Sequence, residues 1–141
     1  MYALSLKQPW AALVLHGLKT IEIRKWATTL RGPILLHAAK VDDDREPGWR
    51  LLPEHARATA RLRGGVIGRI ELVACRVYRT LPEFMIDAQR HHNLAEWFAP
   101  PKMFGFVFHN PRPVNFHHWP GNVRFFTIPR AELEESNPAA S

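Results

Sequence analysis

The chain has 141 residues, of which 46% are hydrophobic and 23% are charged, so it is long enough for one globular domain and too apolar to be disordered. A single cysteine, Cys75, excludes an internal disulfide and a thiolate metal site, which fits a reducing compartment. Nineteen lysines and arginines oppose thirteen aspartates and glutamates, for a net charge of +6. This charge favours a polyanionic partner, with nucleic acid first, although many basic proteins bind no nucleic acid.

No apolar run approaches the ~18 residues needed to span a bilayer, and the N-terminus lacks the pattern of a signal peptide. We therefore expect a cytoplasmic protein without a membrane partner. Residues 131–141 hold three glutamates and no basic residue, which predicts a polar, poorly ordered tail after a single domain at residues 1–130. Without these glutamates, nineteen basic residues oppose ten acidic ones, for a net charge of +9.

The first third of the chain predicts three strands and one helix. Residues 2–6 alternate between polar and apolar and suit a short strand. Residues 9–17 begin with proline and stop with glycine, as short helices often do. Residues 20–26 alternate strictly and predict an amphipathic strand, whereas the continuous apolar run at 33–39 predicts a strand buried on both faces.

The remaining elements are less regular. The sequence predicts a polar loop at 40–49, a helix at 53–62 and a long strand at 64–79. One or two short helices are expected at 81–98, and two aromatic-rich strands at 104–110 and 123–128. A proline-rich loop at 111–121 is expected between the last two strands. Strands outnumber helices, and no strand–helix–strand alternation indicates a parallel sheet. The pattern therefore predicts an α+β fold, a small, curved, mainly antiparallel barrel with short flanking helices.

Several blocks of this sequence resemble, in order and spacing, the ASCH domain, named after activating signal cointegrator homology and a branch of the PUA-like barrels. The blocks are LSLKQPWAALVLHGLKTIEIRKW, RGPILLHAAK, GGVIGRIELVACR, FGFVFHNPRPV and GNVRFFTI, and they cover residues 2–128. The first block looks most like the cointegrator-type domains and their bacterial relatives. The resemblance implies a PUA-like barrel with a cleft, between barrel and helices, that binds RNA, modified nucleosides or DNA ends.

The resemblance also implies two possible enzymatic activities. One bacterial branch of the family deacetylates acetylated cytidine, and another is described as a ribonuclease. The deacetylase pattern places a lysine and a threonine in a G-x-K-T-x-T-x-R segment, with a glutamate farther along the chain. Lys19 matches the lysine, but Glu22 stands in the place of the second threonine, and only Glu83 and Glu96 are candidates for the distant acid. The chain therefore departs from the deacetylase pattern.

Residues 17–26 carry the candidate site, and three interpretations of them are open. In an enzyme, a partly desolvated Lys19 acts as base or nucleophile, and Glu22 relays a proton or orients water. In a binding protein, Lys19 and Arg24 contact phosphate or carbonyl oxygens, and Glu22 accepts a hydrogen bond from an exocyclic amine of a base. Alternatively, Glu22 and Arg24 only pair with each other on an ordinary strand face.

The predicted nucleic-acid-binding set adds the start of the first helix, the strand face and a basic rim. It comprises Lys7, Gln8, Trp10, Lys19, Glu22, Arg24, Trp26 and Lys40. Strand alternation places Trp26 on the face of Glu22 and Arg24, where it is the best candidate for stacking on a base or, alternatively, for covering the barrel. Trp10 is more often a core residue than a stacking platform.

We predict neither a metal nor a cofactor. The adjacent histidine pairs at 91–92 and 117–118 do not share a face, and no zinc-binding spacing is present. The glycines at 64–68 lack the Lys-Ser/Thr of a phosphate-binding loop. The expected partner is single-stranded or end-containing RNA or DNA, or a nucleoside. An adaptor role toward a protein partner is a third possibility, for which the sequence holds no partner-specific motif.

Overall fold

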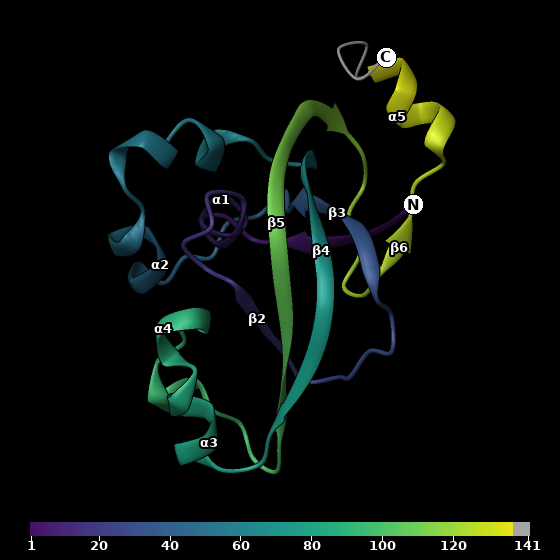
Figure 1. The fold of residues 1–141 in the computed structure, drawn as a ribbon. Coiled ribbons are helices and arrows are strands. Elements are labelled where there is room, and N and C mark those ends of the chain that lie inside the picture. The colour runs from purple at the N-terminus through teal and green to yellow at the C-terminus, as the bar shows by residue number, and fades with distance from the viewer. Residues whose placement is uncertain (137–141) are drawn as a thin grey trace.

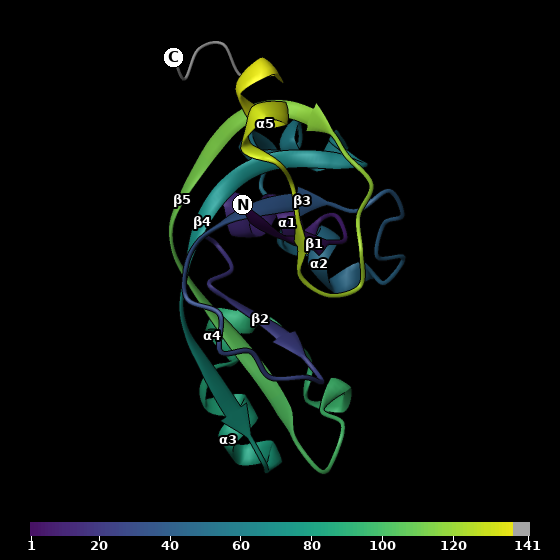
Figure 2. The same ribbon diagram turned by 90° about the vertical axis from the view of Figure 1, so that its right-hand side faces the viewer.

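The computed structural model describes residues 1–136, with side chains as far as residue 133. Six strands form one sheet in the order β2-β5-β4-β3-β1-β6. The strands are β1 (Tyr2–Leu6), β2 (Ile21–Arg24), β3 (Gly32–Ala38), β4 (Gly65–Tyr78), β5 (Met103–His118) and β6 (Phe126–Thr127). The β1–β3 pair is parallel and all other pairs are antiparallel. Figure 2 shows the long strands β4 and β5 bending strongly along their length.

The predicted α+β fold with a curved, mainly antiparallel sheet is confirmed, but the sheet is open. Its two outer strands, β2 and β6, are not paired with each other among the described residues. On the concave side of the sheet, β2 faces the end of β1 across the gap between the two edges (Figure 2), and the Arg24 side chain donates a hydrogen bond across it to the Ser5 carbonyl. The side chains that bridge this gap belong to the candidate site.

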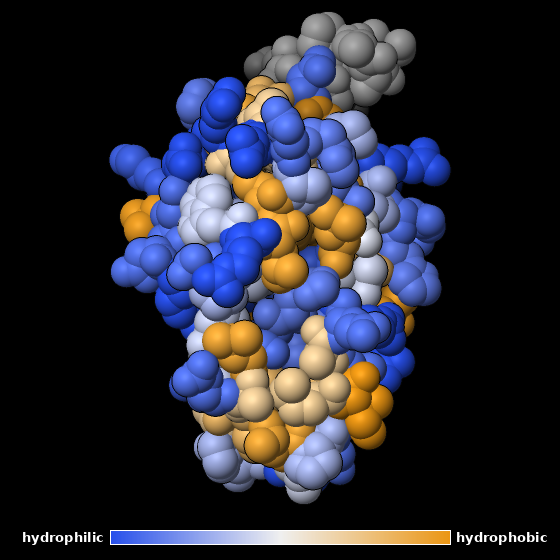
Figure 3. Space-filling model, turned by 90° about the vertical axis from the view of Figure 1, so that its left-hand side faces the viewer, coloured by the Kyte–Doolittle hydropathy of each residue, from blue (hydrophilic) through white to orange (hydrophobic). Residues whose placement is uncertain are grey.

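Short helices flank the sheet. They are α1 (Trp10–Leu15), α2 (Glu46–Leu51), α3 (Leu81–Ile86), α4 (Ala88–His91) and α5 (Arg130–Ser136), with single 3-10 turns at Glu54–Ala56, Thr59–Arg61 and Ala95–Trp97. Figure 3 shows the helix-bearing face, hydrophilic over much of its upper half and more hydrophobic toward the end where α3 lies in Figure 1. Within the described chain, no helix is long and apolar enough to cross a membrane.

Helix α1 and strand β3 form the centre of the core. Five of the six α1 residues are buried, and β3 is buried from Ile34 to Ala38 because it lies between β1 and β4 with α1 packed against it. This confirms the prediction that the apolar run at 33–39 is covered on both faces. On β2, Ile21 is fully buried while Ile23 is only half-buried, since it borders a pocket near the edge of the sheet.

Strand β5 extends through the segment for which we predicted a proline-rich loop. Pro111 and Pro113 both lie within it. Two features make this possible. Strand β2 covers β5 only from Phe104 to Val107, so the later part of β5 has a free edge there, and the β4–β5 register shifts close to Asn110, whose φ is 52°. Free edges and bulges are the places where a strand tolerates proline.

The segment between β3 and β4 also differs from its prediction. The expected loop at 40–49 contains α2, and the expected helix at 53–62 is only two 3-10 turns. Pro47 lies in the first turn of α2, where its missing N–H costs no hydrogen bond. Pro53 keeps the preceding Leu52 extended, with ψ of 114°, and so ends α2.

The stretch predicted as a polar tail, 131–141, begins inside helix α5. Its last five residues, 137–141, lie outside the described residues.

Candidate functional site

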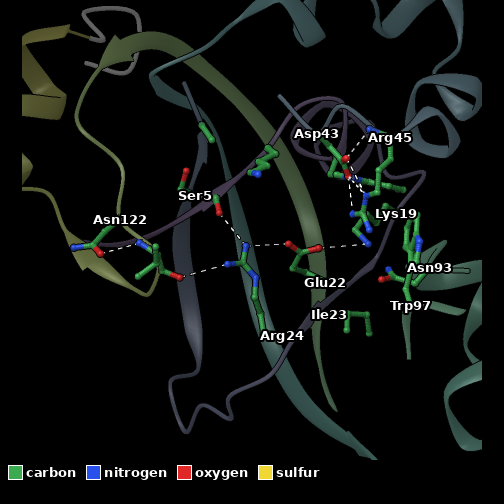
Figure 4. A pocket seen from close by; sticks show the side chains of 14 residues that line it. Ser5, Lys19, Glu22, Ile23, Arg24, Asp43, Arg45, Asn93, Trp97 and Asn122 are labelled. Atoms are coloured by element: carbon green, nitrogen blue, oxygen red, sulfur yellow. Dashed lines mark hydrogen bonds and ion pairs between the residues drawn. The ribbon is translucent and has the colours of Figure 1, made fainter. Parts of the chain in front are cut away.

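A pocket of about 380 Å³ opens between α1, the edge of β2, the loop after β3 and the turn before β5. Figure 4 shows its lining side chains, which come from segments far apart in the sequence. Strand β2 supplies the floor, and the loop at 43–45 together with Trp97 supplies one wall. The opposite side is formed by Ser5 of β1 and by Asn122 and Val123.

Three charged side chains, Arg24, Glu22 and Lys19, form a row across the floor (Figure 4). Glu22 Oε2 lies 2.9 Å from Arg24 Nη2, and Glu22 Oε1 lies 3.4 Å from Lys19 Nζ. Glu22 and Arg24 share a face because they are two residues apart on β2, as the alternation predicts. Arg24 Nη2 also donates to the carbonyl of Ser5 at 2.9 Å and so links β2 to β1 across the gap in the sheet.

Lys19 reaches the floor because the chain reverses at the end of α1. Gly17 has a φ of +74°, which favours glycine, and the next two backbone N–H groups both donate to the carbonyl of Leu13. The Lys19 side chain is only 1% exposed and lies 4.9 Å from the ring centroid of Trp10. Its Nζ donates a 2.5 Å hydrogen bond to the carbonyl of His91.

Burial lowers the pKa of Lys19 below its ordinary value of 10.5, because an ammonium group loses hydration there. The charge and hydrogen bond of Glu22 act in the opposite direction, and the charge of Arg24 lowers the pKa further. The site therefore holds an amine whose proton is released more easily than that of an exposed lysine.

The helical pair α3–α4 holds the carbonyl that binds Lys19. His91 stacks on Phe84 at 4.3 Å, and its Nε2 bonds to the Phe84 carbonyl at 2.7 Å. Asn93 Nδ2 donates to the same His91 carbonyl at 3.0 Å. His91 is fully buried, so this oxygen is fixed by the packing of α3 and α4, which contact the sheet through Tyr78 of β4.

The wall formed by the loop at 43–45 and by Trp97 is an aromatic and ionic cluster. Asp43 accepts a 2.7 Å hydrogen bond from Trp10 Nε1 and a two-pronged pair of bonds from Arg45. Burial alone would raise the pKa of Asp43, but the bonds from Arg45 and Trp10 outweigh it and hold the pKa at about 2. The Arg45 guanidinium lies 3.8 Å from the ring centroid of Trp97. A fixed cation and a fixed indole therefore border the pocket together.

The ASCH domain model matches residues 4–114. The chain belongs to the ASCH domain family. This confirms the resemblance found in the sequence, and the matched range includes the floor and the aromatic wall. ASCH domains have a PUA-like fold that is often linked to RNA binding.

Solved structures of an ASCH protein from Zymomonas mobilis share the fold. The protein itself is 16% identical with a TM-score of 0.64, covering 95% of this chain and 91% of that one. A tyrosine-to-phenylalanine variant gives a TM-score of 0.67 at 12% identity, covering 95% and 94%. A serine-to-alanine variant gives a TM-score of 0.66 at 14% identity, covering 95% of this chain and 92% of that one. At such identities the likeness shows the fold alone. No curated protein sequence matches the chain.

The ASCH pocket brings together five of the eight residues that we predicted for nucleic-acid binding. These are Lys7, Trp10, Lys19, Glu22 and Arg24. Lys7 is exposed at the rim, whereas Trp10 is 7% exposed and belongs both to the core and to the pocket wall. Lys19 and Glu22, which we predicted as the catalytic residues of an enzyme, both lie on the floor.

The other three predicted residues lie elsewhere. Gln8 is fully buried, and its amide donates to the carbonyls of Thr59 and Leu62 and accepts from the N–H of Ala12. Trp26 packs edge-on against aromatic rings of the core because β2 ends at Arg24, so the alternation does not extend to it. Lys40 lines a different hollow.

Sequence reasoning missed Asp43, Arg45, Asn93 and Trp97. Their segments have no hydrophobic period, and the conformation of the loop at 43–45 depends on hydrogen bonds from Trp10, which is distant in the sequence, and from Trp49. One signal was available, because the acidic run at 42–44 and Arg45 directly follow a buried strand, and functional side chains often sit on such loops. No group of three histidine, cysteine, aspartate or glutamate side chains that could hold a metal ion is found among residues 1–136.

Proposed function

We propose that this ASCH domain binds single-stranded nucleic acid by taking one unpaired nucleotide into the pocket. The observation that supports this most strongly is the charge of the lining, where four cations, Lys7, Lys19, Arg24 and Arg45, accompany two carboxylates, Glu22 and Asp43. The volume of about 380 Å³ lies within the range of about 300–1,000 Å³ that is usual for small-ligand sites. A nucleotide offers both an anion and a flat ring to such a site.

Glu22 is suited to read the edge of the base. A carboxylate accepts hydrogen bonds only, so it favours a base with an exocyclic amine, such as cytosine or adenine, over uracil. Its bonds to Arg24 and Lys19 leave lone pairs free and keep the group in place before the ligand arrives. A fixed acceptor loses little entropy on binding, which makes it an effective source of discrimination.

The aromatic wall is suited to hold the ring and the phosphate. Trp97 presents an indole to the pocket, and base–aromatic stacking contributes about 1–3 kcal/mol per base. Arg45 is 52% exposed and Lys7 is exposed, so both can meet a phosphate that remains in contact with water. Exposed cations of this kind give affinity that falls steeply with salt.

Two arginines provide a matched test. Arg45 lines the pocket and pairs with Asp43, whereas Arg50 is on α2, pairs with Glu46 at 2.6 Å and does not line it. In fluorescence anisotropy titrations of a labelled single-stranded oligonucleotide at low salt, Arg45→Gln should weaken binding about tenfold or more. Arg50→Gln should leave the affinity within about twofold. Absence of binding by the wild type, or equal losses in the two variants, would contradict the proposal.

A second candidate function is supported by Lys19 specifically. A buried lysine with a lowered pKa, 3.4 Å from a carboxylate, is the type of group that acts as a base or nucleophile. The alternative is a hydrolase that acts on a modified nucleoside or on RNA. In hydrolysis of an acetylated cytidine, water would add to the acyl carbon and the C–N bond would break, releasing acetate and cytidine. Turnover that disappears in Lys19→Met would favour this enzyme, and binding without turnover would favour the binding protein.

A further inference from the structure

A second hollow of about 590 Å³ adjoins the pocket and is bordered by His37, Lys40, Arg63, His118, Trp119 and Gly121. Two pairs of chain neighbours connect the linings, because Ala39 and Asn122 line the pocket while Lys40 and Gly121 line the second hollow. Consecutive Cα atoms are about 3.8 Å apart, so the two spaces are close enough for adjacent units of one polymer.

A thin partition separates the two spaces. Ser5 lines the pocket, and its Oγ lies 2.9 Å from Nδ1 of His37, which lines the second hollow. The backbone of Gly121 passes directly over this pair, since a Cβ there would lie 2.9 Å from His37 Cε1 and 3.1 Å from Ser5 Oγ. His37 Nε2 lies 2.6 Å from the carbonyl oxygen of Trp119. The partition is therefore held by the two hydrogen bonds of the buried His37 side chain.

We propose that the second hollow is a subsite for the neighbouring nucleotide of the same single strand, so that the ligand is a polynucleotide and not a free nucleoside. This inference rests on the proposed function of the pocket. Trp119 supplies the stacking surface, and Lys40 with His118 supplies contacts to the connecting phosphate. The shared chemistry is a base joined to a phosphodiester, which RNA and DNA both offer.

The charges and the position of Trp119 support this assignment. Lys40 is exposed, and within the described chain it makes no ion pair. All three guanidinium nitrogens of Arg63 are already hydrogen-bonded, Nε and Nη2 to Asp42 at 2.7 and 2.8 Å and Nη1 to the carbonyl of Arg61 at 3.2 Å. Lys40 and the exposed His118 are therefore the rim groups free to meet an anion. No carboxylate lines the hollow among the described residues. The indole of Trp119 stacks on His117 with centroids 5.9 Å apart, which orients it before a ligand binds.

The distribution of tryptophans allows a direct test by NMR. Trp10 and Trp97 line the pocket and Trp119 lines the second hollow, whereas the partly buried Trp26 packs against the core and lines neither space. Their indole N–H signals in ¹⁵N-labelled full-length protein are assigned with single Trp→Phe variants. The titrants are cytidine monophosphate, the tetranucleotide of cytidine, and the tetranucleotide of deoxycytidine.

We expect cytidine monophosphate to shift the signals of Trp10 and Trp97 alone. A tetranucleotide should also shift the signal of Trp119, and it should bind at least about tenfold more tightly than the mononucleotide. Lys40→Ala should weaken tetranucleotide binding about threefold to tenfold without changing binding of the mononucleotide. The control is Lys102→Ala, because Lys102 is an exposed lysine directly before β5 that lines neither space. The subsite is supported if either tetranucleotide acts in this way. The ratio of the affinities for the cytidine and deoxycytidine tetranucleotides reports whether the subsite prefers ribose or deoxyribose.

Two different failures are distinguishable. If the tetranucleotides bind no more tightly than the mononucleotide and leave Trp119 unmoved, the subsite is wrong while the proposed function of the pocket stands. If no titrant shifts Trp10 or Trp97, the proposed function is wrong, and the subsite inference fails with it.

Discussion

Lys19 and Lys40 line neighbouring spaces and are held in opposite ways. Lys19 is 1% exposed and is fixed by the His91 carbonyl and by Glu22, whereas Lys40 is exposed and makes no ion pair in the described part of the chain. A buried charge depends on its partners and is screened little by salt, while an exposed charge is screened strongly. The pocket floor should therefore control stability and choice of base, and the rim of the second hollow should control affinity for a polyanion.

Arg24 shows why the floor also concerns stability. It lies on the edge strand β2, pairs with Glu22, and donates to the Ser5 carbonyl on β1 across the gap between the sheet edges. The fold uses a side chain here where a closed barrel would use a ladder of backbone hydrogen bonds. No equivalent bridge involves Lys40 among the described residues. The following predictions test this difference.

The largest effect should follow from removing the carboxylate of the floor. Glu22→Gln leaves Lys19 and Arg24 as adjacent cations, one of them buried, and we expect a loss of about 3 kcal/mol in the free energy of unfolding. Lys19→Met removes the buried charge and leaves the Glu22–Arg24 pair intact, so its cost should stay below about 1 kcal/mol. Urea denaturation at pH 7 measures both. Equal losses would mean that the row of charges is not coupled.

Asp43→Asn should lower the free energy of unfolding by about 1–2 kcal/mol at pH 7, because the pKa of Asp43, about 2, lies below the ordinary 3.8. The loss should be smaller than this pKa shift alone would give, because the partner Arg45 is half exposed and solvent screens the pair. A lowered carboxyl pKa stabilises the folded state above 3.8, and this contribution is lost as the pH falls toward 2. The difference between wild type and variant should thus shrink over this acid range. A difference that does not change with pH would assign the cost to packing.

Lys19 should produce a pH effect on the alkaline side. Its folded pKa is lowered by burial, so between that value and the ordinary 10.5 the unfolded chain binds more protons than the folded chain. Stability of the wild type relative to Lys19→Met should therefore rise as the pH increases toward 10.5. Denaturation curves recorded from pH 7 upward measure this trend, and parallel pH profiles would show that Lys19 titrates as an exposed lysine.

The smallest effect on stability should belong to Lys40→Ala, within about 0.5 kcal/mol, as for most exposed positions. Its effect on binding should be visible in the salt dependence. The slope of log affinity against log salt concentration for an oligonucleotide should become shallower by about 1, which corresponds to one lost phosphate contact. An unchanged slope would remove Lys40 from the interface.

Much of the fold follows from sequence periodicity. The strict alternation around Ile21 and the apolar run of β3 predict strands that the structure contains, and a proline–glycine pair brackets α1. The extension of β5 through Pro111 could not be predicted, because it depends on which of its edges is left free by β2. The start of α2, in contrast, has a signal in the sequence, because Pro47 lies in its first turn.

The candidate site divides in the same way. Alternation placed Glu22 beside Arg24, and the junction of helix and strand pointed to Lys19. Asp43, Arg45 and Trp97 were not predictable, because their places depend on tertiary hydrogen bonds and ring contacts and have no sequence period. Trp26 lies outside the pocket because β2 ends at Arg24 and the alternation does not extend to it.

The central claim is that the row of Lys19, Glu22 and Arg24 recognises a base in the pocket. Its most direct test is a pair of calorimetric or NMR titrations with cytidine and uridine monophosphate. These ligands share sugar and phosphate, but cytosine presents an amine to Glu22 where uracil presents a carbonyl. We predict that the wild type binds the cytidine nucleotide about tenfold more tightly, in line with about 1–3 kcal/mol for a base contact, and that Glu22→Gln removes the preference. Equal affinity for the two nucleotides in the wild type would contradict the claim.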